Sequence, residues 1–284
     1  MRFFALLAGL LAFLAQPAGA ASSPRLQSLE RQLGSLMASR PGDHGLAALD
    51  LRSGELVGVR ADEPFPMAST VKVAIAANYL AQVEHGQRSL ESKIGGRTAA
   101  KLMEVMIVHS DNRATDLLLR DLGGPKTVQA WLDQHEMRGI RIDRTIAQLL
   151  GDRRNLYDTR DSSTPRAMVE LLRRLDSGKL LKPASQTYLL NLMSRCVTGK
   201  NRIRGLLPEG TRVENKTGTL SGLTTDVGFI TLPDGRRLAV AFFARNGADR
   251  PNTIAWAARA IYDGFAAWFY QPFVGTALAP DVSR

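Results

Sequence analysis

Two residues three positions apart could form a nucleophile and its base. Ser69 and Lys72 lie in a turn of small residues, 66–72, that leads into the apolar segment 73–80. If a helix begins at or just before Ser69, this spacing places the hydroxyl and the ammonium on one face, one turn apart. Lysine can take the proton of a serine if burial or nearby positive charge lowers its pKa. The pair suggests covalent catalysis, although it also fits a capped helix start with a solvated lysine.

Two later stretches carry groups that could complete such a site. A Ser-Asp-Asn triplet at 110–112 supplies a hydroxyl, a carboxylate and an amide, and it precedes the apolar helical run 114–119. A Lys-Thr-Gly-Thr run at 216–219 comes at the end of a predicted strand. In this order the three stretches resemble the S-x-x-K, S-D-N and K-T-G elements of the class A serine β-lactamases and penicillin-binding proteins. The similarity covers most of the chain from about residue 26 to 269.

The resemblance implies a role for each site residue. Ser69 would attack a carbonyl and form an acyl-enzyme, with Lys72 as its base, while Ser110 would relay a proton to the leaving nitrogen. Lys216 would hold Ser110 and the substrate carboxylate electrostatically. The remaining implied roles are an oxyanion hole from the backbone N–H groups of Ser69 and Thr219, and substrate binding by Asn112, Thr217 and Thr219.

Some of these residues have simpler interpretations. Ser110 and Asn112 could be turn and cap residues. We expect the Asp111 carboxylate to cap a neighbouring turn, and His109 to be a packed neighbour of the motif rather than an acid or base. Only 41 positions (110 − 69) separate Ser69 from Ser110, fewer than in class A enzymes, which predicts a more open cleft.

The region from 144 to 165 resembles the omega loop of class A enzymes but departs from it at two positions. Arg144 with Asp158, and then residues 161–165, carry this likeness, and residues 198–204 resemble the segment ahead of K-T-G. The family places a glutamate two residues after the loop arginine, to activate the water that hydrolyses the acyl-enzyme. That position is Ile146, and the water-holding asparagine aligns with Leu150; counting back from 161 gives Gln148 instead of Ile146. Either count removes the carboxylate.

Three functions follow if acylation is intact and the usual deacylating group is absent. The first is a slow or selective β-lactamase, in which Lys72, Gln148 or Asp143 positions the water. The second is a D-alanyl-D-alanine peptidase that acts on a peptidoglycan stem peptide. The third is a penicillin-binding sensor that remains acylated. We favour β-lactam hydrolysis because the chain is a compact exported domain with the class A order of motifs.

Composition bounds the environment and the partners. Residues 1–20 have the basic start, short apolar core and small residues of a signal peptide cleaved before Ala21, which predicts a secreted, periplasmic protein without a stable membrane anchor. Cys196 is the single cysteine, so no intrachain disulfide can form, and its apolar neighbourhood predicts burial. The net charge of +10 is dispersed, which favours solubility and anionic envelope polymers over nucleic acid. The four histidines lack ligand-like spacing, so we expect no metal and no cofactor, and we expect a monomer.

The elements that must position these residues follow from periodicity and turn signals. The sequence predicts an α+β fold, with an antiparallel five-stranded sheet flanked by N- and C-terminal helices and an inserted all-helical subdomain. The predicted catalytic domain is 21–284, with an α/β part at about 21–65 and 205–284 and a helical part at about 66–204. Predicted strands are 45–51, 56–60, 211–216, 224–232 and 237–244. Predicted helices are 26–37, 99–108, 127–137, one starting at 164–165, 185–193, and one capped by Asn252 with Phe269 near its end, while 140–157 is irregular or loosely helical.

Overall fold

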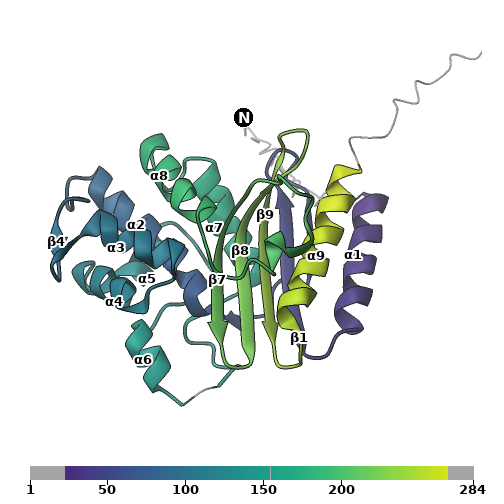
Figure 1. Ribbon diagram of the computed structural model, residues 1–284, viewed down its shortest axis with the longest axis horizontal. Coiled ribbons are helices and arrows are strands. Elements are labelled where there is room, and N and C mark those ends of the chain that lie inside the picture. The colour runs from purple at the N-terminus through teal and green to yellow at the C-terminus, as the bar shows by residue number, and fades with distance from the viewer. Residues whose placement is uncertain (1–22, 154, 268–284) are drawn as a thin grey trace, which may run out of the picture.

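A five-stranded antiparallel sheet forms the centre of the protein, in a computed structural model that describes residues 23–153 and 155–267 (Figure 1). Its strand order is β2-β1-β9-β8-β7, so the first two strands of the chain lie beside the last three. The bounds are β1 Asp43–Asp50, β2 Leu56–Val59, β7 Val213–Leu220, β8 Leu223–Thr231 and β9 Arg237–Arg245. The predicted fold class is confirmed. The predicted signal peptide and Phe269 lie outside the described residues.

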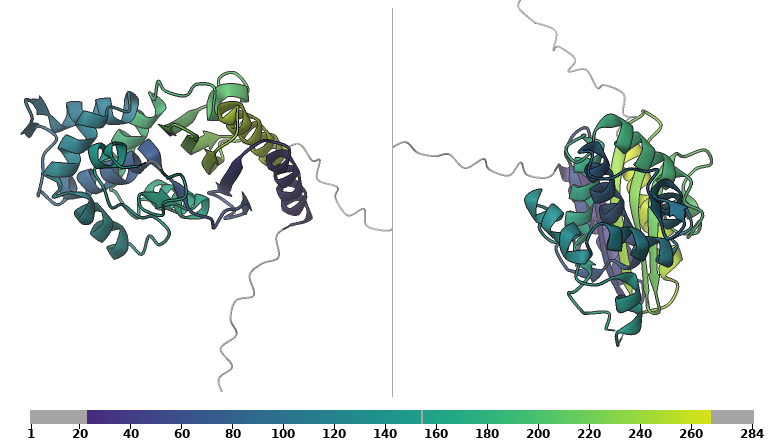
Figure 2. Two further views of the ribbon diagram at one scale, coloured as in Figure 1. Left: turned by 90° about the horizontal axis from the view of Figure 1, so that it is seen from below. Right: turned by 90° about the vertical axis from the view of Figure 1, so that its left-hand side faces the viewer.

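The N- and C-terminal helices cover one face of the sheet (Figures 1 and 2). Helix α1, Pro24–Ala38, buries Leu26, Leu29, Leu33 and Met37, whose spacing of three and four residues forms a single apolar stripe. Helix α9, Arg250–Ala266, packs beside it. The prediction that Asn252 caps α9 is wrong, because Asp249 is the N-cap and Pro251, whose fixed φ suits a first turn, already lies inside the helix.

The remaining helices lie on the other face of the sheet and beyond its β7 edge (Figure 2). Helix α7, Pro165–Asp176, contacts β1, β8 and β9, and the Thr164 hydroxyl caps its start by accepting from the Ala167 N–H at 3.1 Å. Helix α2, Lys72–Glu84, is buried from Lys72 to Ala81 because other helices surround it. Those neighbours are α3 Ala99–Val108, α4 Asn112–Asp121, α5 Pro125–Gln134 and α8 Pro183–Ser194; the short α6 spans Ile146–Gly151.

Short elements connect the sheet to the helical part. The pair β3 Phe65–Pro66 and β6 Ser162–Ser163 brings the residues just before Ser69 against the end of the loop that starts at Arg144. The other short elements are β4 Lys93–Ile94, β5 Arg97–Thr98 and the 3₁₀ turns η1 Ala68–Val71 and η2 Ile203–Leu206. In the described part of the chain, none of the helices combines the length and apolarity that a membrane span requires.

Two predicted boundaries differ from the structure. The helix predicted at 127–137 ends at Gln134, because Glu136 adopts a left-handed conformation, φ 52°, that a helix cannot continue through. The strand predicted to end at 216 continues to Leu220, where it still pairs with β8. Glycine suits position 218 of this longer strand, because a Cβ there would lie only 2.3 Å from the Thr225 hydroxyl oxygen and 2.7 Å from the Met67 carbonyl oxygen.

Candidate active site

Ser69 lies in a tightly held turn. It belongs to η1 and is partly exposed, while its neighbours Met67, Ala68 and Thr70 are buried. The Met67 carbonyl accepts from both the Thr70 N–H, at 3.2 Å, and the Thr70 hydroxyl, at 2.7 Å. Ala68 has φ 48°, a left-handed conformation that surrounding contacts must maintain. Ser69 is therefore partly exposed in a turn that is held by buried neighbours and hydrogen bonds, as a nucleophile requires.

Lys72 is fully buried and uses all three of its ammonium hydrogens. Its Nζ donates to the Ser110 carbonyl at 2.7 Å, to the Ser110 Oγ at 3.2 Å and to the Asn112 Oδ1 at 2.8 Å. Ser110 has φ 61°, and this kink just before α4 turns both its carbonyl and its hydroxyl toward Lys72. Two of the motif stretches identified in the sequence thus meet at one ammonium group.

The pKa of Lys72 is lowered to about 7. Burial is the main cause, because it penalises the charged form, and the positive charge of Lys216 adds to it, while Asp111 and Asp116 oppose the shift. Near neutral pH a large fraction of Lys72 is therefore an uncharged amine. An uncharged amine one turn from Ser69 can accept the proton of the serine hydroxyl.

Lys216 joins the same cluster from the middle of β7. Its Nζ donates to the Ser110 Oγ at 2.9 Å and to the Thr217 carbonyl at 2.8 Å, and burial lowers its pKa to about 8. The Ser110 hydroxyl consequently lies between two lysines, which suits a group that passes a proton. Asp111 caps α4 as predicted, its Oδ1 accepting from the Ala114 N–H at 2.6 Å. His109 is exposed at the end of α3 rather than packed, so that prediction is wrong.

Arg202 contacts one of the predicted site residues, although the sequence indicated no role for it. It is only 8% exposed, and its guanidinium donates to the Thr219 hydroxyl at 2.7 Å and to the Gly218 carbonyl at 3.0 Å. The Thr217 hydroxyl lies 2.5 Å from the hydroxyl of Thr198. Both contacts come from the segment 198–204. Its likeness to the segment ahead of K-T-G in class A enzymes is the feature of the sequence that could have indicated a role for Arg202. Arg202 adds a second positive charge on the Lys216 side.

Cys196 lies beside Thr198, the residue that contacts Thr217. It is buried, as predicted, and its Sγ is 3.3 Å from the Thr198 hydroxyl. In the part of the chain that the structure describes, no group of three His, Cys, Asp or Glu side chains could hold a metal ion.

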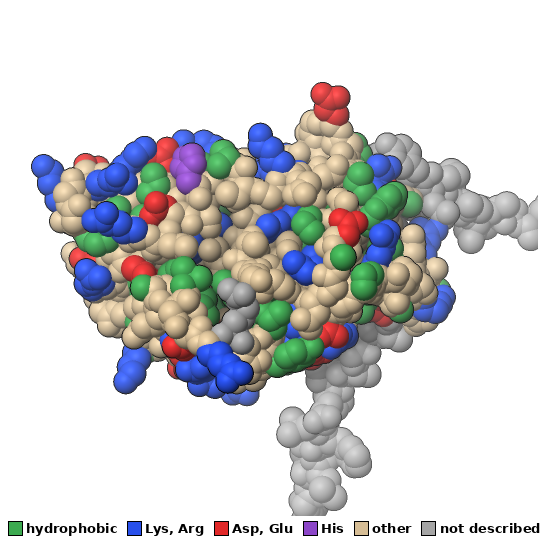
Figure 3. Space-filling model, turned by 60° about the horizontal axis from the view of Figure 1, so that its bottom comes forward, with side chains coloured by type: hydrophobic (Ala, Val, Ile, Leu, Met, Phe, Trp, Pro, Cys, Tyr) green, Lys and Arg blue, Asp and Glu red, His purple; other side chains and the backbone are tan. Residues whose placement is uncertain are grey.

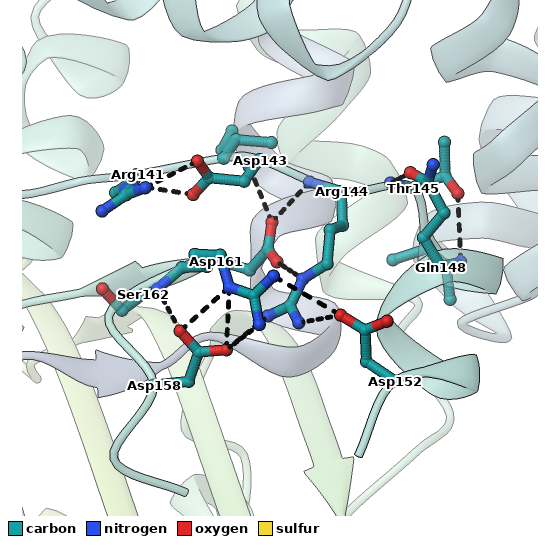
Figure 4. A network of polar contacts seen from close by, with 12 residues as sticks. Arg141, Asp143, Arg144, Thr145, Gln148, Asp152, Asp158, Asp161 and Ser162 are labelled. Carbon is teal, nitrogen blue, oxygen red and sulfur yellow. Dashed lines mark hydrogen bonds and ion pairs between the residues drawn. The ribbon is translucent and has the colours of Figure 1, made fainter. Parts of the chain in front are cut away.

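The loop that begins at Arg144 is closed by a network of ion pairs (Figure 4). The Arg144 guanidinium contacts Asp158 at 3.3 Å, as the sequence suggested, but its contacts with Asp161 at 2.5 Å and Asp152 at 2.6 Å are shorter. The other oxygen of Asp161 accepts from the backbone N–H groups of Asp143 and Arg144, at 2.8 and 3.0 Å. The base of the loop is therefore fixed by one arginine and one nearly buried carboxylate.

Among the positions that the sequence suggested for water activation in the loop, none carries an unpaired carboxylate. Ile146 is buried, and Leu150 is 55% exposed on α6. The Gln148 Oε1 accepts from the Thr145 N–H at 2.9 Å in a capping box at the start of α6, so this side chain is already engaged. The Asp143 carboxylate forms an ion pair with Arg141 at 2.8 Å (Figure 4).

Known proteins resemble this chain over most of its length. The family model described as the β-lactamase enzyme family matches residues 28–265. The carbapenem-hydrolysing β-lactamase KPC of Klebsiella oxytoca is 32% identical over 249 residues, 78% of this chain and 84% of that protein. The extended-spectrum β-lactamase PER-1 of Pseudomonas aeruginosa is 30% identical over 255 residues, 79% of this chain and 82% of that protein.

Solved structures extend the likeness to three dimensions. The reconstructed ancestral class A β-lactamase of Gram-negative bacteria superposes with a TM-score of 0.80 at 34% identity, covering 84% of this chain and all of the ancestral one. The sheet and the inserted helices therefore occur together here as parts of one known architecture. The chain belongs to the β-lactamase enzyme family.

Proposed function

We propose that the protein is a serine hydrolase that opens β-lactam rings through an acyl-enzyme whose hydrolysis is slow. The observation that carries the proposal is the convergence of Lys72, Ser110 and Lys216, with Lys72 three residues after Ser69 at the start of α2. Neutral Lys72 removes the Ser69 proton as Oγ attacks the lactam carbonyl carbon. The C–N bond then breaks, Ser110 gives its proton to the nitrogen, and protonated Lys72, 3.2 Å away, restores the Ser110 proton.

The two walls of the site would bind opposite ends of the substrate. Lys216 and Arg202 supply positive charge, and Thr217 a hydroxyl, for the carboxylate beside the lactam nitrogen. Asn112 holds the amide of the acyl side chain from the opposite wall. The backbone N–H groups of Ser69 and Thr219 stabilise the oxyanion, where each donor is worth about 3 kcal/mol.

Deacylation is the step in which this chain differs from its family. Ile146 has no proton acceptor, Gln148 is held in its capping box and Asp143 is paired with Arg141. Of Lys72, Gln148 and Asp143, only Lys72 is left as a base for the deacylating water. It can activate water only after it has passed its proton through Ser110. We therefore propose that acylation is faster than deacylation.

The same absence of a carboxylate favours two alternative functions. A long-lived acyl-enzyme can transfer its acyl group to another acceptor, as in a D-alanyl-D-alanine peptidase, or can persist, as in a penicillin-binding sensor. Release of D-alanine from a stem-peptide mimic would identify the peptidase, and an adduct that is stable for hours would identify the sensor.

We also propose that the enzyme works outside the cytoplasm as a monomer, after cleavage before Ala21. The apolar start of the chain and the extracytoplasmic location of the candidate substrates support this proposal. N-terminal sequencing of the exported protein should begin at Ala21, and light scattering should give the mass of one chain. An intact N-terminus in the mature protein would contradict the export proposal.

Time-resolved intact-mass spectrometry tests the central proposal. Wild-type protein mixed with a penicillin should gain the mass of one penicillin rapidly and return slowly to its original mass, with product formed over several turnovers. Ser69→Ala should gain no mass. An unmodified wild-type protein throughout, with every penicillin, cephalosporin and carbapenem tried, would refute the proposed function.

A further inference from the structure

A groove of about 490 Å³ lies between α4 and α6, next to the candidate active site. Residues from one stripe of α4 face the first turns of α6 across it, since positions three and four apart share a helix face. Its size is within the range of about 300–1,000 Å³ that is typical of small-molecule pockets. The residues that matter here are Asn112, Arg113, Leu117 and Arg120 of α4, and Ile146 and Leu150 of α6.

The groove and the active site share a wall. Asn112 lines the groove, and its Oδ1 accepts from the Lys72 ammonium at 2.8 Å, so one side chain borders both spaces. In the proposed function Asn112 holds the amide of the acyl side chain. The part of the substrate beyond that amide would therefore extend into the groove.

The lining combines an apolar floor with basic groups. Leu117, Ile146 and Leu150 supply apolar surface. Arg113 and Arg120 are exposed, and among the described residues neither has a hydrogen-bonded or ion-paired acidic partner. In Figure 3, where the bottom of the molecule comes toward the viewer, basic side chains project from the helical end on the left.

The one acidic residue of the lining is already engaged. Asp116 accepts from the Ile146 N–H at 2.7 Å through Oδ1 and from the Ala147 N–H at 2.9 Å through Oδ2. Both of its oxygens are thus directed to the start of α6. The groove retains two guanidinium groups that a ligand can approach.

We infer that this groove binds the acyl side chain of β-lactams that carry an anionic group on that side chain. The inference rests on the proposed function, and it adds Arg113 and Arg120 as specificity-determining residues. An apolar side chain with a carboxylate would place its apolar part against Leu117 and Leu150. Its carboxylate would lie near the two arginines.

The test uses two penicillins that differ only in this charge: benzylpenicillin and the same molecule with a carboxylate on the side-chain α-carbon. The measured quantity is the ratio of their second-order rate constants for acylation of Ser69. In Arg113→Glu/Arg120→Glu the ratio of charged to neutral substrate should fall about tenfold or more, and in each single alanine variant about two- to fivefold. The effect should shrink in 1 M salt, where screening is strong.

A control at a distant site tests whether reversing an exposed charge elsewhere changes the ratio. Arg31→Glu introduces the same kind of charge change on the exposed side of α1, across the sheet from the groove, and should leave the ratio within about twofold of wild type. A ratio that Arg113→Glu/Arg120→Glu does not change, with both penicillins still acylating Ser69, would overturn the inference alone. If neither penicillin acylated wild-type Ser69, the proposed function would fail and the inference with it.

Discussion

Replacing Lys72 with methionine should stabilise the fold in a pH-dependent manner. The buried ammonium is unfavourable in the folded state, which is why its pKa falls from an ordinary value of 10.5 to about 7. At about 1.36 kcal/mol per pH unit, this difference corresponds to about 5 kcal/mol of lost stability when both states are protonated. Methionine has a similar length and carries no charge, so Lys72→Met removes this cost.

The sign follows from proton binding. Between pH 7 and 10.5 the unfolded chain holds the Lys72 proton and the folded chain does not, so wild-type stability rises with pH over this window. At pH 6 the cost in the wild type is about 5 kcal/mol, and at pH 9 it is about 2 kcal/mol. The stability advantage of Lys72→Met should thus be about 3 kcal/mol larger at pH 6 than at pH 9. Packing changes caused by methionine do not titrate and cancel in this comparison.

Urea denaturation of both proteins at the two pH values measures the effect. Lys126, exposed on α5, provides the control, because Lys126→Met removes one positive charge without removing a buried one. The difference in free energy of unfolding between Lys126→Met and the wild type should be the same at pH 6 and pH 9. A difference for Lys72→Met that is equally independent of pH would refute the argument that Lys72 is held uncharged near neutrality.

Further predictions concern the site and its loop. The acylation rate should rise with pH through about 7, as Lys72 loses its proton, and should fall above about 8, as Lys216 loses its proton. Quenched-flow mass spectrometry measures this rate, and a rate that is constant from pH 6 to 9 would contradict the roles of both lysines. Ile146→Glu should shorten the lifetime of the acyl-enzyme about 100-fold, since it supplies a general base, whereas Ile146→Gln should not shorten it. Equal acyl-enzyme lifetimes in the two variants would argue that position 146 does not contact the deacylating water. Asp161→Asn should lower the free energy of unfolding by about 3 kcal/mol, because it leaves a nearly buried Arg144 without its shortest ion pair. Adding Arg144→Ala to this variant should lower the free energy of unfolding little further. Urea denaturation measures both variants, and additive losses would show that the two residues act separately.

Local elements could be predicted from the sequence because near neighbours specify them. The apolar stripe of α1, the Thr164 cap of α7 and the Asp111 cap of α4 each depend on residues within four positions of one another. Helix ends were less predictable, as Asn252 shows, because competing caps such as Asp249 are also polar and lie only a few residues away.

The sequence by itself determined the chemical groups of the candidate site, their order along the chain and the absence of a carboxylate at positions 146, 148 and 150. The tertiary structure alone decided which groups meet: it places Ser110 between Lys72 and Lys216, which lies 106 positions further along the chain. It also places the Arg202 guanidinium against the Thr219 hydroxyl and engages the Gln148 side chain in a capping box. The reason is physical, since the burial that lowers the pKa of a lysine, and the contacts that orient a hydroxyl, come from strands and helices that are distant in sequence and adjacent only in the folded protein.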